Sequence, residues 1–136
     1  MESVDSIRMC PTDPKRAERL AARSTSYVIN DYLTTPGPNA ILSLYKLKAT
    51  SKTITVFEGS DVRSADPALE HAHCSLWFSP LNVARHKVYS ELVKDIQPDR
   101  HSAVAHYLYA DGHVDSISDE KIFEWSESGH DFALPE

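Results

Sequence analysis

The sequence predicts an α+β fold made of a single domain over residues 1–136. A helix pattern lies near the N-terminus and several β-prone runs follow it. Two of these runs flank Asp111-Gly112, a pair of residues typical of a tight β-hairpin. Consecutive antiparallel strands with helices before and after them belong to the α+β class. The length of 136 residues and the 41% hydrophobic content suffice for one modest core.

The first predicted element is a helix over 15–23, preceded by a loop. Asp13 is suited to cap this helix, and Pro14 is tolerated at the first helical position because that position needs no N–H donor. Ala17, Leu20 and Ala21 share one face of this helix, and because that apolar stripe is thin, the helix is predicted to lie on the surface.

Two strands are predicted next, over 26–30 and 53–58. The first contains β-branched and aromatic residues and ends at the turn-forming residues 34–39. In the second, Ile54 and Val56 are expected on one face and Phe57 on the other, and the strand is expected at or near the sheet centre.

Residues 61–93 are harder to assign. A polar loop over 61–70 leads into the segment 71–78, which Pro80 ends. Residues 83–93 are predicted as a helical turn or an irregular stretch.

The C-terminal third of the sequence has the clearest secondary-structure signals. Residues 103–109 and 113–117 are predicted to pair through a type I′ turn at Asp111-Gly112. Ser118 is expected to cap a helix over 119–126 that points Ile122, Trp125 and Phe123 inward. Phe132, Ala133 and Leu134 are expected to dock on the body, and Trp77, Phe78, Phe123 and Trp125 to act as core anchors.

Charge and composition exclude several partners. The chain has 14 basic and 20 acidic residues, a net charge of −6, and its basic residues are scattered. This balance argues against nucleic acid and against an anionic membrane surface. The four glycines form no phosphate-binding loop, so no nucleotide and no other cofactor is expected. No apolar run reaches transmembrane length, so no membrane contact by this chain is expected.

Two cysteines, Cys10 and Cys74, leave two alternatives open. They can form one disulfide, or they can be two buried free thiols. Composition does not fix the redox compartment that would decide between them.

Seven histidines raise the hypothesis of a metal site. His71 and His73 would point to one face of a strand, and Cys74, Asp111 or His113 would add a third ligand. The spacing matches no zinc motif, and the preferred interpretation is solvated histidines with no metal. No nucleophile elbow accompanies Ser75 or Ser79, so no catalytic residues are assigned.

Four blocks in the sequence resemble a known family. His101 is separated by nine residues from Asp111-Gly112, and "RHSAVAHYLYADGHVDSI" resembles the C-terminal signature of prepilin-like proteins with an H-x9-D-G motif. Three further blocks occur in the family's order, and the tail "IFEWSESGHDFALPE" is similar too: "MCPTDP" (9–14), "STSYVINDY" (24–32) and "SKTITVFEGSD" (51–61).

Two departures from the family pattern stand out. The family's N-terminal prepilin segment and its long apolar helix are missing, and the polar start at residues 1–6 has the character of a domain cut from a longer chain. His106 stands where the family commonly has Asn.

The resemblance implies a pilin-like head, an antiparallel sheet with short helices whose N-terminal spine helix is absent. It implies a structural subunit of a type II secretion or type IV pilus-like assembly, not an enzyme. Such a protein lies on the periplasmic or cell-surface face of the inner membrane. Its partners are other pilin or pseudopilin subunits, contacted through the missing helix, and components of the secretion system.

Within that motif we expect a structural role for His101, Asp111 and Gly112. Asp111-Gly112 would make the hairpin turn, and His101 would be a polar staple bonded to backbone or to Asp111. Two alternative functions remain. One is a metal-dependent binding or hydrolytic domain using His71 and His73. The other is a carbohydrate- or peptide-binding module with an exposed aromatic groove around Trp77 or Trp125.

Overall fold

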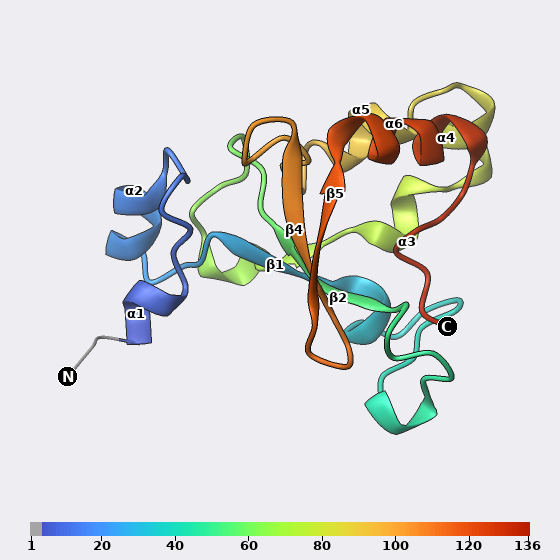
Figure 1. The fold of residues 1–136 in the computed structure, drawn as a ribbon, viewed down its shortest axis with the longest axis horizontal. Helices are drawn as coiled ribbons and strands as arrows, with labels where there is room; N and C mark the ends of the chain where they lie inside the picture. Colours follow the sequence, from blue (N-terminus) through green and yellow to red (C-terminus); the bar gives the residue numbers. More distant parts are fainter. Residues whose placement is uncertain (1–3) are drawn as a thin grey trace.

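The computed structural model describes residues 4–136, which form an α+β fold around one five-stranded sheet with the strand order β3-β1-β2-β4-β5 (Figure 1). The predicted fold class is therefore confirmed. Residues 1–3, part of the polar start, lie outside the described residues, and Val4–Ile7 forms the short helix α1 where a loop was expected.

The sheet is mostly antiparallel. β1 (Tyr27–Asn30) pairs antiparallel with β2 (Ile54–Glu58), which is the central strand, as predicted. β2 pairs antiparallel with β4 (Val104–Tyr109), and β4 with β5 (Val114–Ser118). The two-residue strand β3 (His71–Ala72) runs parallel to β1 at one edge.

A bulge in β2 changes the predicted alternation. Ile54 pairs with Tyr109, whereas Val56 pairs with Leu108, so the register shifts between them. Ile54 and Phe57 both enter the core, and Val56 lies half-buried. The prediction that Ile54 and Val56 share a face is wrong because an extra residue in one strand resets the two-residue period.

The β4–β5 hairpin is confirmed, but its turn is not type I′. Gly112 has φ 93°, and Asp111 does not have positive φ. The Gly112 N–H donates to the Tyr109 carbonyl at 2.9 Å, and the Tyr109 N–H donates to the His113 carbonyl at 2.9 Å. Tyr109 and His113 therefore close the hairpin, and the three residues between them are the length that takes a type I turn followed by one left-handed glycine.

Helix α2 (Arg16–Ala21) forms inside the predicted range and lies on the surface, as predicted. Its buried residue is Arg19, whereas Ala17, Leu20 and Ala21 are exposed. Lys15 is the residue at the N-cap, and Asp13 accepts a hydrogen bond from the Lys15 N–H at 2.8 Å. Arg19 turns inward because Asp13 is buried beside it and binds its guanidinium.

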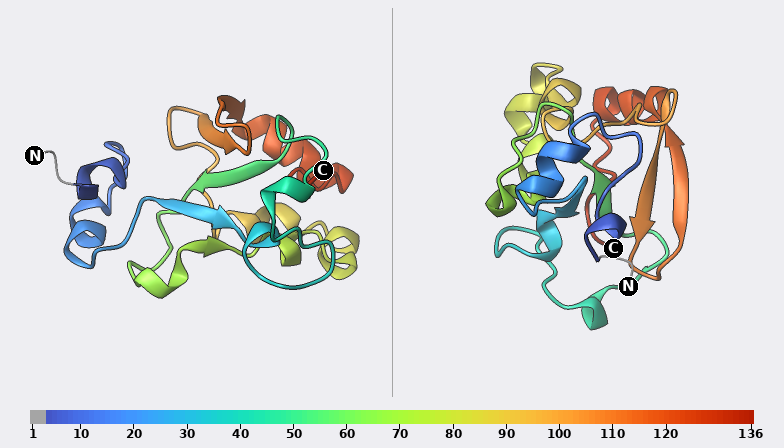
Figure 2. Two further views of the ribbon diagram at one scale, coloured as in Figure 1. Left: turned by 90° about the horizontal axis from the view of Figure 1, so that it is seen from below. Right: turned by 90° about the vertical axis from the view of Figure 1, so that its left-hand side faces the viewer.

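The remaining α-helices are α3 (Cys74–Trp77), α4 (Pro80–Ala84), α5 (Val88–Leu92) and α6 (Asp119–Ser128). Three 3-10 helices, η1, η2 and η3, lie in the connecting segments: Asp31–Leu33, Leu44–Lys46 and Pro67–Leu69. Ser118 caps α6 as predicted, accepting the Lys121 N–H, and Gly129 with φ 72° ends it. Helices α1 and α2 lie at one end of the long axis and α3–α6 toward the other (Figure 2).

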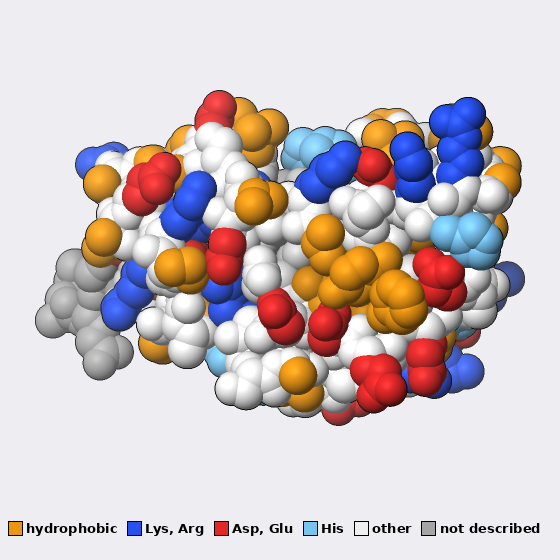
Figure 3. Space-filling view, turned by 90° about the horizontal axis from the view of Figure 1, so that it is seen from above, with side chains coloured by type: hydrophobic (Ala, Val, Ile, Leu, Met, Phe, Trp, Pro, Cys, Tyr) orange, Lys and Arg blue, Asp and Glu red, His pale blue; other side chains and the backbone are white. Residues whose placement is uncertain are grey.

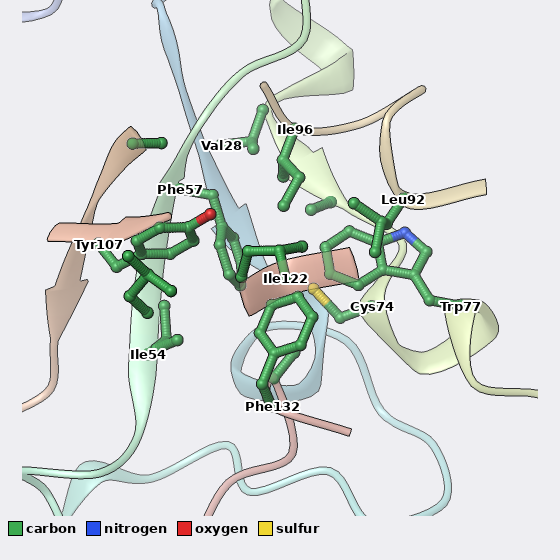
Figure 4. Packing of buried hydrophobic residues seen from close by; sticks show 14 of the residues in the cluster. Val28, Ile54, Phe57, Cys74, Trp77, Leu92, Ile96, Tyr107, Ile122 and Phe132 are labelled. Carbon is green, nitrogen blue, oxygen red and sulfur yellow. The ribbon is translucent and has the colours of Figure 1, made fainter. Parts of the chain in front are cut away.

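The core lies between the sheet and helices α3, α5 and α6 (Figure 4). Trp77, 1% exposed, contacts Phe57 edge-on with ring centroids 5.7 Å apart, which confirms Trp77 as a core anchor. Half-buried Trp125 stacks on Phe132, and Phe132 and Ala133 dock as predicted. The expectations for Phe123 and Leu134 are wrong, because both are exposed.

Phe123 is exposed on α6, and Figure 3, which views the molecule from above, shows an exposed apolar group with acidic side chains on several sides of it. Phe123 is 48% exposed and meets the ring of Tyr89 with centroids 5.3 Å apart.

The two faces of the sheet differ. The covered face carries Val28, Phe57, Ala105, Tyr107 and Ile117 into the core. The opposite face, called the open face below, presents half-buried or exposed apolar side chains: Tyr27, Ile29, Val56, Leu108 and Val114. Among residues 4–136, no helix has the length and apolar character needed to cross a bilayer.

Candidate functional site

Three side chains of metal-ligand type meet at the open face of the sheet. Cys10 Sγ lies 3.4 Å from Glu58 Oε1 and 3.8 Å from His101 Nε2, and the last two atoms are 2.7 Å apart. We call this group the Cys–Glu–His cluster. Within residues 4–136 it is the group of three such side chains with ligand atoms close enough to hold one metal ion.

Cys10 and Glu58 are brought together by the end of β2. The Ser26 N–H donates to the Arg8 carbonyl at 2.9 Å, which fixes the N-terminal segment beside the start of β1. Gly59, directly after Glu58, donates its N–H to the Ser26 carbonyl at 2.7 Å. A Cβ at Gly59 would lie 3.0 Å from that carbonyl oxygen, so glycine permits this close approach.

His101 precedes a tight turn into β4. Ser102 and Ala103 have φ of 57° and 69°, the left-handed region that disfavours side chains. The His101 N–H donates to the Val104 carbonyl at 2.8 Å across this turn. Strained backbone of this kind concentrates at functional sites.

Neighbouring groups hold each member of the cluster. The His106 N–H donates to the second carboxylate oxygen, Glu58 Oε2, at 2.9 Å. The Thr12 hydroxyl lies 3.2 Å from Cys10 Sγ. The His106 ring lies over the His101 ring with centroids 4.5 Å apart. The positions of all three functional groups are therefore fixed by the fold.

The cluster lines a pocket of about 490 Å³ on the open face. The rest of the lining is mainly apolar: Pro11, Tyr27, Val56, Phe57, Leu108 and Val114. Cys10 is buried and the Glu58 side chain is 3% exposed, whereas the His101 side chain is 25% exposed. The imidazole is the side of the cluster that solutes can reach.

The geometry does not match a Cys–His–Glu catalytic triad. In a triad the acid binds one ring nitrogen and the nucleophile the other, so that the histidine passes a proton between them. Here both Cys10 and Glu58 face the same nitrogen, His101 Nε2. The three functional groups therefore converge on one point and do not form a proton relay through the imidazole.

A second buried carboxylate lies nearby. Asp13 Oδ2 accepts from Arg19 Nε at 2.9 Å, and both side chains are fully buried. Arg19 also donates to the carbonyls of Ser60 and Ser64. Although burial raises the pKa of the Asp13 carboxyl, hydrogen bonds from Ser26 and the Lys15 N–H, together with the Arg19 charge, outweigh it, and the pKa lies below its usual range.

The structure separates the metal candidates of the sequence. His71 and His73 lie at the β3 edge with ring centroids 4.9 Å apart, and His73 Nδ1 is 3.2 Å from Asp95 Oδ1. Asp111 and His113 pair at 2.6 Å at the tip of the β4–β5 hairpin, which forms the opposite edge. The four residues therefore do not form one site.

One other expectation, the partner of His101, is corrected, and the choice between the two cysteine alternatives is decided. His101 binds Glu58, not Asp111, because Asp111 lies at the opposite end of β4. Cys10 and Cys74 are both buried free thiols and are not joined. Cys74 lies in the core, where burial raises the pKa of its thiol well above the usual value.

Of the two tryptophans expected at an exposed aromatic groove, Trp125 lines a pocket and Trp77 does not. Trp77 is buried, so it offers no platform. Trp125 lines a pocket of about 300 Å³ together with Tyr109 and His113. Its ring is half-buried and already stacked on Phe132.

Sequence reasoning missed the Cys–Glu–His cluster, although a signal was present. Cys10, Glu58 and His101 lie in three different blocks of the prepilin-like resemblance, 48 and 43 residues apart along the chain. Comparison with protein-family models, curated proteins and solved structures gives no significant match.

The structure itself shows a mixed α+β fold in which one face of the sheet is open and carries the Cys–Glu–His cluster.

Proposed function

We propose that this protein is the globular head of a pilin-like or pseudopilin-like subunit, a structural component of a type II secretion or type IV pilus-like assembly. The observation that carries the proposal is the open face of the sheet. It presents a continuous set of apolar side chains from β1, β2, β4 and β5, which is the surface a spine helix needs in a pilin-like head.

The covered face explains why a helix would take the open one. Helices α3, α5 and α6 already fill the covered face with a packed aromatic core. On the open face, Val114 is 61% exposed and Leu108 half-buried, so an apolar helix laid there would remove their side chains from water. Burying apolar surface is worth about 25 cal/mol per Å², which favours this contact.

The four sequence blocks fit the same interpretation. Tyr27 and Asn30, from the block "STSYVINDY", lie in β1, where Asn30 donates to the carbonyls of Ile54 and Ala133. The block therefore links two strands and the C-terminal tail. In this role the protein lies outside the inner membrane and contacts other subunits and secretion components through the spine helix.

Thiol labelling with a membrane-impermeant maleimide tests this proposal. Val114→Cys places a thiol on the open face, and Leu81→Cys, at a position 57% exposed on α4, is the matched control. Both should react rapidly in the purified chain. In spheroplasts of cells producing the protein from its own gene, Leu81→Cys should still react and Val114→Cys should be protected.

Two outcomes would overturn the proposal. Equal labelling at both positions in spheroplasts would mean that no helix covers the open face. Labelling at neither position until the cells are lysed would place the protein on the wrong side of the membrane. The wild-type chain, whose cysteines are buried, gives the background.

A further inference from the structure

The Cys–Glu–His cluster offers three different ligand atoms to one point in space. The thiol comes from the segment before α2, the carboxylate from the end of β2 and the imidazole from the turn before β4. Their ligand atoms all lie within 4.8 Å of one another.

The two separations from the sulfur are close to those of a tetrahedral zinc site, and the carboxylate–imidazole separation is shorter. Zinc bonds of about 2.3 Å to sulfur and about 2.0 Å to nitrogen or oxygen place neighbouring ligands about 3.3 to 3.6 Å apart. The observed separations are 3.4, 3.8 and 2.7 Å, so each needs to change by only roughly 0.6 Å or less. We propose that Cys10, Glu58 and His101 bind a zinc ion, with the fourth coordination position directed to the pocket.

The ligand types favour zinc over calcium or magnesium. Hard cations prefer sets made of oxygen atoms, whereas a thiolate and an imidazole favour zinc and related transition metals. Three protein ligands with an open fourth position are typical of zinc sites that accept a water molecule or another ligand. In the isolated chain, with no spine helix on the open face, the pocket of about 490 Å³ supplies the space for that ligand.

The surrounding groups act as the outer shell of such a site. The His106 N–H holds Glu58 Oε2 at 2.9 Å, which leaves Oε1 to face the ion. The Thr12 hydroxyl at 3.2 Å can donate to the Cys10 thiolate. Hydrogen bonds of this kind fix ligand orientation and raise metal affinity. His101, with a quarter of its side chain exposed, provides the route of entry.

Zinc would join three segments that are far apart in the sequence. A ligand that binds only the folded chain stabilises it by mass action, and the unfolded chain has no preformed site. At a zinc concentration about 100 times the dissociation constant, the melting temperature should rise by roughly 5–10 °C.

The experiment uses the purified chain after chelator treatment and reduction of its thiols. Zinc content by mass spectrometry should reach one ion per chain, and zinc should raise the melting temperature. Cobalt in place of zinc should give a near-ultraviolet thiolate-to-cobalt band and intense visible bands, which report sulfur ligation and tetrahedral geometry without any mutation.

Variants assign the site. Cys10→Ser and His101→Gln should abolish the cobalt bands and the zinc-induced rise in melting temperature. Cys74→Ala and His73→Gln should lower neither, since both positions lie outside the cluster. The proposal is overturned if the wild-type chain binds no stoichiometric zinc, if the thiolate band survives Cys10→Ser, or if Cys74→Ala removes it.

Discussion

Two buried carboxylates, Asp13 and Glu58, fix the N-terminal segment to the sheet in different ways. Asp13 pairs with Arg19, whose other donors reach the Ser60 and Ser64 carbonyls, and the pair is closed to solvent. Glu58 pairs with His101 and Cys10 beside a pocket. A guanidinium is a permanent cation and no metal ligand, whereas an imidazole and a thiol can exchange protons for a metal. The first arrangement is a structural lock, and the second is suited to binding.

The largest effect is predicted for a substitution that breaks the buried Asp13–Arg19 pair. Arg19→Met leaves the Asp13 carboxylate buried without its counter-charge, which should lower the free energy of unfolding by about 3–5 kcal/mol. Urea denaturation at neutral pH measures this. Lys121→Met, which breaks an exposed pair with Glu124, is the control and should cost less than about 0.5 kcal/mol. Equal losses in the two variants would contradict the assignment of a lock.

The Asp13–Arg19 pair also predicts that the free energy of unfolding falls at acid pH. The pKa of Asp13 in the folded chain lies below the ordinary value of 3.8, so the unfolded chain takes up the proton first as the pH falls. The stabilisation is therefore complete well above pH 3.8 and is lost as the pH falls through the folded pKa. The stability difference between wild type and Arg19→Met should narrow in urea titrations from pH 6 toward roughly pH 3. A constant difference would show that Asp13 does not titrate with unfolding.

An intermediate loss of stability is predicted for a substitution in the Cys–Glu–His cluster. His101→Ala removes the hydrogen-bond partner of Glu58 Oε1 and should cost about 1–3 kcal/mol in chelator-containing buffer. His113→Ala, at the exposed hairpin tip, should change stability by less than about 0.5 kcal/mol. Thermal melts of both variants compare two of the three histidines in the block "RHSAVAHYLYADGHVDSI". An unchanged melting temperature for His101→Ala would contradict the proposed structural role of His101.

The smallest effect concerns the strained turn beside the cluster. Ala103 has φ 69°, a conformation that costs a side chain about 1–2 kcal/mol and a glycine almost nothing. After the greater chain entropy of glycine is subtracted, Ala103→Gly should stabilise by about 0.5 kcal/mol. Ala68→Gly, in the helical turn η3 where φ is negative, should destabilise instead by about 0.5–1 kcal/mol. Calorimetry of both variants tests for these opposite signs.

Local chemistry in the sequence determined strands β1, β2, β4 and β5 and helices α2 and α6. The Asp111-Gly112 hairpin, the Ser118 cap and the central strand over 53–58 were all predictable, because each depends on residues within a few positions of one another. Local patterns did not determine the structure where distant groups intervened. The bulge in β2 reset the face of Val56, and the buried Asp13 turned Arg19, not Leu20, toward the body.

By itself the sequence determined the α+β class, the order of the strands along the chain and the presence of Cys10, Glu58 and His101 in separate blocks. Only the tertiary structure decided that these three side chains meet, that the metal candidates at His71 and Asp111 lie at opposite edges, and that one sheet face stays open. The reason is physical: pairing across β1, β2 and β4 brings together residues more than 40 positions apart, and no local periodicity encodes such contacts.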